Sequence, residues 1–170
     1  MEPYRLRRWR PSYSSQAVQF FTCARPGRSK GPSGLVRDEL VHKWVHELPG
    51  NPTSVIISLL GRKHGPEGDS EFSFYSFHGA WDTEVERRGR PSFQEWLQRW
   101  HNGMQVVERP TYDFRPVAPE TKGAVASDTS RYLSEGRTVV LVDSGGASRV
   151  EQVCKYMGYV EDSRATHSLL

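Results

Sequence analysis

The chain is poor in cysteine, with two in 170 residues, Cys23 and Cys154. Two cysteines so far apart supply neither a disulfide framework nor the paired spacing of a zinc site, so we expect a reduced, intracellular protein. The sequence also lacks the roughly 18 consecutive apolar residues that a membrane-spanning helix needs. Its first residues contain no apolar segment typical of a secretory signal. These absences predict a cytoplasmic protein with no metal or other cofactor and no membrane association.

The chain does have enough hydrophobic material for one globular domain. Hydrophobic residues make up 36% of it and aromatic residues 11%, which favours a packed core over disorder. The net charge is +3, and positive charge is concentrated in the first thirty residues, at Arg5, Arg7, Arg8, Arg10, Arg25, Arg28 and Lys30. Such a cluster can attract nucleic acid or acidic partners. No nucleic-acid-binding motif accompanies it, so we interpret residues 1–16 as a basic, partly flexible tail and do not expect a nucleic-acid partner.

Apolar runs alternate with amphipathic stretches over residues 17–160. Strands are predicted at residues 17–23, 53–60, 71–77, 104–109 and 138–142, and helices at 35–48, 91–100, 120–133 and 148–157. Strands that alternate with helices predict a single α/β domain with a central, mostly parallel sheet flanked by helices. Residues 161–170 are left as a C-terminal tail.

The segment 138–150, TVVLVDSGGASRV, combines a buried strand, a glycine loop and the start of a helix. Gly145 and Gly146 let the backbone turn sharply, and successive N–H groups before a helix N-terminus form an anion cradle. Arg149 would add a bidentate fork for a phosphate-like group. The predicted anion-binding residues are Ser144, Gly145, Gly146, Ala147, Ser148 and Arg149. The carboxyl end of a strand is where α/β sheets place their ligands.

The same segment resembles the signature of the cysteine-dependent protein tyrosine and dual-specificity phosphatases. That signature reads His-Cys, two residues, Gly, two residues, Arg, then Ser or Thr. Gly146 and Arg149 match it, whereas Val142, Asp143 and Val150 stand at the histidine, cysteine and hydroxyl positions. The order of elements over residues 23–159 is also similar to that of the small dual-specificity phosphatases, which implies their fold.

In that family a thiolate attacks phosphorus, an arginine holds the phosphate oxygens and an aspartic acid protonates the leaving oxygen. The segment 108–120, ERPTYDFRPVAPE, looks like the general-acid loop, which implies this role for Asp113; Asp82 is a second candidate. At the nucleophile position, Asp143 would be a poorer nucleophile and would repel a phosphate dianion, since its carboxylate is charged at neutral pH. We expect it to accept the loop N–H groups and to pair with Arg149, as a built-in anion plug.

These losses predict a pseudophosphatase-like protein, inactive or severely impaired, that binds a phosphorylated or other protein partner. Val142 and Val150 point the same way, because the resemblance implies that a histidine orients the loop and a hydroxyl helps the phosphoenzyme break down. Two alternatives stay open. One is an active phosphatase with an unusual mechanism that retains Arg149 and Asp113. The other is an unrelated α/β binding domain whose glycine loop is only structural.

Asp143 also has the local look of the nucleophile of haloacid dehalogenase-type phosphatases, but their motif needs a second acidic residue where Gly145 stands. The segment around Cys23 resembles the loop of low-molecular-weight tyrosine phosphatases. Only four residues separate Cys23 from Arg28, however, and Pro26 lacks an amide hydrogen. We therefore interpret Cys23 as a packed strand-end residue, and Cys154 as a core residue of the last helix.

The remaining polar and aromatic candidates have simpler interpretations. His42 and His46 are one helical turn apart without an acidic companion, so we expect surface residues and no metal site. Arg115 lies beside Asp113 and is expected to be solvated. Trp96 and Trp100 share a helical spacing that favours packing.

Overall fold

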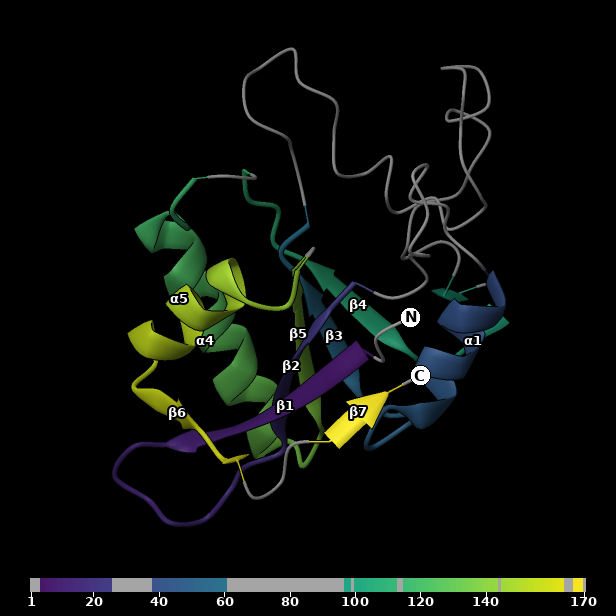
Figure 1. Cartoon of the computed structure of the whole chain (residues 1–170), viewed down its shortest axis with the longest axis horizontal. Helices are drawn as coiled ribbons and strands as arrows, with labels where there is room; N and C mark the ends of the chain where they lie inside the picture. The colour runs from purple at the N-terminus through teal and green to yellow at the C-terminus, as the bar shows by residue number, and fades with distance from the viewer. Residues whose placement is uncertain are drawn as a thin grey trace.

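The computed structural model describes residues 4–25, 38–60, 97–98, 100–112, 115–143, 145–163 and 167–169. In these ranges the strands join into one sheet: β1 (Tyr4–Pro11), β2 (Phe20–Ala24), β3 (Val55–Ser58), β4 (Gln105–Glu108), β5 (Val139–Asp143), β6 (Tyr159–Glu161) and β7 (His167–Leu169). The strand order is β4-β3-β5-β2-β1-β6, and β7 also pairs with β1. Helix α1 (Asp38–Glu47) covers one face of the sheet, whereas α4 (Pro119–Ser134) and α5 (Ser148–Tyr156) cover the other (Figure 1).

The sheet has a parallel part and an antiparallel part. Strands β4, β3, β5 and β2 run parallel to one another, while β1 is antiparallel to β2, β6 and β7. The predicted α/β domain with helices on both faces is confirmed. The sheet is more mixed than predicted, because the two ends of the described chain add the antiparallel strands.

Each face of the sheet carries its own hydrophobic cluster. Because successive side chains of a strand point to opposite faces, Val140 and Val142 of β5 pack on the side of α1, and Val139 and Leu141 pack on the side of α4 and α5. All four are fully buried. Burial on both faces explains the continuous apolar run that marked β5 as a central strand.

The expectation of a basic, flexible tail over residues 1–16 was wrong for residues 4–11, which form β1. Leu6 is completely buried and Trp9 is 6% exposed. Two of the arginines lie over aromatic rings, Arg7 over Trp9 and Arg8 over Phe21. A long arginine stem can cover apolar surface while its charge stays near water, so basic composition did not prevent strand formation.

The expected C-terminal tail, residues 161–170, is likewise corrected in part. Glu161 ends β6, and residues 167–169 form β7; both strands pair with β1. The predicted strand at 71–77 and most of the predicted helix at 91–100 lie outside the described residues. None of the described helices is long and apolar enough to span a membrane.

Candidate functional site

The candidate site lies at the carboxyl end of the parallel strands. Asp143 is the last residue of β5, and its register partner in β2 is Ala24. The backbone continues in hydrogen-bond contact past the strand ends: Arg25 N–H donates to the Asp143 carbonyl at 2.8 Å, and Leu59 N–H donates to the Val142 carbonyl at 2.8 Å. The edges of β2, β3 and β5 therefore hold the start of the glycine loop in place, at the sheet edge where α/β proteins place ligands.

The loop between β5 and α5 depends on Gly146. Its φ angle is +72°, and a Cβ atom there would lie 2.6 Å from the backbone nitrogen of Ala24. Both the left-handed conformation and the close approach to β2 demand glycine. The helix that follows begins at Ser148, so the loop leads directly into a helix N-terminus.

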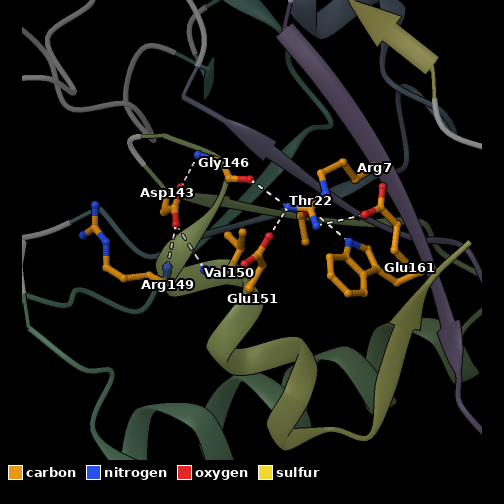
Figure 2. A network of polar contacts seen from close by, with 9 residues as sticks. Arg7, Thr22, Asp143, Gly146, Arg149, Val150, Glu151 and Glu161 are labelled. Atoms are coloured by element: carbon orange, nitrogen blue, oxygen red, sulfur yellow. Dashed lines mark hydrogen bonds and ion pairs between the residues drawn. The ribbon is translucent and has the colours of Figure 1, made fainter. Parts of the chain in front are cut away.

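The Asp143 carboxylate is held by three backbone N–H groups of this loop and helix. Oδ1 accepts a hydrogen bond from Gly146 N–H, and Oδ2 accepts from Arg149 N–H at 3.0 Å and from Val150 N–H at 3.1 Å (Figure 2). The residue is 2% exposed. Amides at a helix N-terminus favour negative charge. The carboxylate accepts loop N–H groups as expected: Gly146 and Arg149 belong to the predicted set, and Val150 was not predicted.

We expected the Arg149 side chain to pair with Asp143, but its guanidinium is directed away from this carboxylate (Figure 2). Its Nη1 donates to Thr111 Oγ1 at 2.9 Å and lies 3.5 Å from the carbonyl oxygen of Leu59. Thr111 Oγ1 in turn donates to the same Leu59 carbonyl at 2.6 Å. Arg149 is 4% exposed. The arginine at the signature position of the phosphatase resemblance is therefore buried at the edge of the site. It contacts Asp143 through its backbone N–H.

A second arginine, Arg7 of β1, reaches the loop from the opposite side. Its Nη1 donates to the Gly146 carbonyl at 3.2 Å and lies 2.8 Å from Glu151 Oε1, and its Nη2 lies 3.0 Å from Glu161 Oε1 (Figure 2). Burial opposes the charge, but the hydrogen bonds and attraction of Glu161 and Glu151 outweigh it and raise the pKa of Arg7. Sequence reasoning missed this residue, since no local pattern links it to a carbonyl 139 positions away.

The other predicted site residues have varied outcomes. Asp113, Ser144 and Asp82 lie outside the described residues. Gly145, Ala147 and Ser148 lie along the loop and at the start of α5, at the protein surface. Arg115 is exposed, as expected, and its guanidinium lies over the ring of Tyr112, 5.3 Å from the centroid. The two valines at the degenerate signature positions, Val142 and Val150, are fully buried.

Both cysteines are packed in the core, as predicted. Cys23 is completely buried, and Trp44 Nε1 donates to its sulfur at 3.4 Å. Burial, with a smaller contribution from the charge of Asp143, raises the pKa of Cys23 to about 12. Burial also raises the pKa of Cys154. Since the thiolate is the nucleophilic form, neither cysteine is suited to attack phosphorus at neutral pH.

His42 and His46 meet a third imidazole that the sequence did not indicate. His42 Nδ1 and His101 Nε2 are 2.8 Å apart and share a hydrogen bond, and the rings of His46 and His101 are 5.3 Å apart. Burial, together with the neighbouring His42 and His46, lowers the pKa of His101. Within the described ranges, no group of histidine, cysteine and carboxylate side chains could hold a metal ion.

No protein-family model and no curated protein matches this chain. Among solved structures it is similar to kinase-associated phosphatase, studied with its catalytic-site cysteine replaced by serine: the TM-score is 0.59 at 17% identity, covering 91% of this chain and 72% of that one. A second similar structure is Tk-PTP, with a TM-score of 0.47 at 12% identity over 82% of this chain and 68% of that one. The first likeness shows that the chain has the fold of the dual-specificity phosphatases, as its resemblance implied.

Proposed function

We propose that this protein is a pseudophosphatase: a phosphatase-type domain that is inactive or severely impaired in catalysis and acts by binding a phosphorylated or other protein partner. The observation that carries the proposal is the Asp143 carboxylate, which takes three backbone N–H groups at the end of β5. A cytoplasmic location is part of the proposal, and the two free, buried cysteines fit it.

The chemistry of this site disfavours phosphoryl transfer. Both carboxylate oxygens of Asp143 accept hydrogen bonds from the loop. These hydrogen bonds make the oxygens poorer nucleophiles than those of a free carboxylate. A phosphate oxygen at about 4 Å would meet a repulsion of about 4 kcal/mol per unit charge at an effective dielectric constant of about 20. That repulsion corresponds to a loss of roughly a thousandfold in affinity. The carboxylate therefore acts as a plug in a cradle whose backbone is otherwise suited to an anion.

The alternative is an active phosphatase that retains Arg149 and Asp113 and uses an unusual mechanism. This alternative is favoured by Arg149, a cation that is buried beside Thr111 at the edge of the site. The alternative requires Asp143 to attack phosphorus, or to activate a water molecule, with an oxygen that already accepts a hydrogen bond from a loop amide. Turnover by the natural chain separates the two functions.

Hydrolysis of a small aryl phosphate tests the proposal directly. The natural chain, Asp143→Cys and Asp143→Ser are assayed, each with and without Arg149→Ala. We expect no turnover from the natural chain and from Asp143→Ser, and an Arg149-dependent burst of about one product per Asp143→Cys molecule. Slow release should follow the burst because Val150 supplies no hydroxyl. Turnover by the natural chain that is lost with Arg149→Ala would overturn the proposal in favour of the enzyme.

Binding of inorganic phosphate tests the plug without any need for catalysis. Asp143→Ser removes the charge and leaves the loop amides, so it should bind phosphate on the order of a hundredfold to a thousandfold more tightly than the natural chain. Arg149→Ala in the same background should weaken that binding. Equal affinity of Asp143→Ser and the natural chain would show that the carboxylate does not exclude anions.

A further inference from the structure

We propose that Arg7 of β1 is a positioning residue for the anion cradle: it holds the Gly146 carbonyl outward so that the loop amides face inward. The effect of Arg7 on anion binding rests on the proposed function, which it deepens; its effect on the loop does not. Arg7 acts through the glycine loop, whose carbonyl it binds, and through the first turn of α5.

The peptide plane after Gly146 has little preference of its own. Glycine adopts positive and negative φ about equally readily, so the observed φ of +72° must be stabilised by contacts. The residue is held from two sides: its N–H donates to the Asp143 carboxylate, and its carbonyl accepts from Arg7 Nη1 (Figure 2). Removal of the outer contact leaves Gly146 with the inner hydrogen bond and its close approach to Ala24.

Arg7 is itself fixed in place by its neighbours in the sheet. Glu161 accepts from Nη2 at 3.0 Å, the guanidinium lies 4.8 Å from the centre of the Trp9 ring, and Trp9 Nε1 is anchored to Thr22 Oγ1 at 2.8 Å. The Arg7 side chain is 13% exposed and that of Glu161 is 26% exposed, so water screens this pair less than a surface pair. Because these contacts already order the Arg7 side chain, it loses little conformational entropy when it binds the Gly146 carbonyl.

The same guanidinium also reaches the first turn of α5. Arg7 Nη1 lies 2.8 Å from Glu151 Oε1, and Glu151 follows directly after Arg149 and Val150, whose N–H groups hold the carboxylate. Glu151 is half exposed, so this ion pair contributes little energy by itself. Its geometric effect is to join the loop and the helix N-terminus to one side chain, and thus to keep all three amides of the cradle in register.

An ion pair that only stabilises the fold would affect the whole sheet, whereas a positioning residue would affect the loop first. Native-state amide hydrogen exchange separates the two, because local and global opening are measured at different amides. Gly146 N–H reports the loop, and Val140 N–H, in the centre of β5 between β2 and β3, reports global opening. Exchange is measured with Asp143 in place, so the comparison needs no added anion.

Three variants are required for the exchange experiment. Arg7→Gln should speed exchange at Gly146 about tenfold relative to Val140, since a charge-assisted hydrogen bond is lost. Arg7→Lys keeps the charge and should restore part of the protection. Arg10→Gln is the matched control: it makes the same charge change in the same strand, and Arg10 donates to the carbonyls of Pro11 and Ser14 instead. An equal change at Gly146 and Val140 in Arg7→Gln, or the same local effect in Arg10→Gln, would overturn the inference.

A phosphate titration extends the test to the cradle. In the Asp143→Ser background, Arg7→Gln should weaken the binding of inorganic phosphate about tenfold, and Arg10→Gln should not. Equal phosphate affinity with and without Arg7→Gln would overturn the inference. If Asp143→Ser itself binds no phosphate, the anion plug of the proposed function fails instead, and the exchange experiment still decides the role of Arg7.

Discussion

Substitution of Gly146 by alanine should be the most damaging glycine replacement in the loop. Two penalties combine at this position. An L-residue at a φ of +72° costs about 1–2 kcal/mol. The new Cβ would also lie 2.6 Å from Ala24 N and 3.1 Å from the carbonyl carbon of Cys23. Both atoms are backbone at the end of β2, so they cannot rotate away, and overpacking of this kind costs about 1–3 kcal/mol. We expect Gly146→Ala to lower the free energy of unfolding by about 3 kcal/mol.

Two other glycines separate the two penalties. Gly136 has a φ of +78°, and a Cβ added there would meet nothing within 4 Å, so Gly136→Ala measures the conformational penalty alone. Gly145 has neither a positive φ nor a neighbour within 4 Å of an added Cβ, so Gly145→Ala should be within about 0.5 kcal/mol of the natural chain. Urea unfolding of the three variants gives the comparison. A cost at Gly146 no larger than that at Gly136 would refute the close approach of the loop to β2.

The packing of β1 and β2 yields the remaining predictions. Leu6→Ala should cost about 2–5 kcal/mol of unfolding free energy because Leu6 is completely buried. A change under about 0.5 kcal/mol would instead indicate that residues 4–11 form a loose tail. Trp9→Phe and Thr22→Val each break one buried hydrogen bond, so each should cost about 1 kcal/mol, and a double-mutant cycle should show coupling between them; additive costs would contradict the contact. The thiol of Cys23 ionises near its ordinary pKa of 9.0 when unfolded but at about 12 when folded. The unfolded state therefore releases a proton first, and stability should fall as pH rises from about 9 to about 12. Urea unfolding across that range should show a shallower fall in Cys23→Ala, and an unchanged slope would count against the burial of the thiol.

The central strands and the cradle could be predicted because their signals are local in the sequence. The apolar run of β5 reflects burial on both faces, and the contact of Asp143 with the amides of Gly146, Arg149 and Val150 joins residues at most seven positions apart. Gly146 and the helix start at Ser148 lie within five positions of Asp143, so the sequence shows these parts of the cradle together. Local sequence patterns of this kind carry fold information directly.

The errors arose where the structure depends on distant residues. Because of its arginines, β1 has the composition typical of a flexible tail. The burial of Leu6 becomes visible only when the pairing of β1 with β2, β6 and β7 is known. The contact between Arg7 and the Gly146 carbonyl spans 139 positions, and His101 joins His42 across 59 positions. Neither pairing leaves a periodic signal, because each depends on the relative placement of whole elements.

The pairing of β1 also has a consequence for synthesis of the chain. One edge of β1 can join β2 early, whereas its other edge is covered by β6 and β7, which lie near the opposite end of the sequence and are made much later. Until then the nascent chain exposes an open strand edge, and such edges recruit strands from other molecules. Positive charge on an edge strand opposes that association. The arginines at positions 5, 7, 8 and 10 would thus protect the growing chain on the ribosome from aggregation, before Arg7 contacts the finished glycine loop.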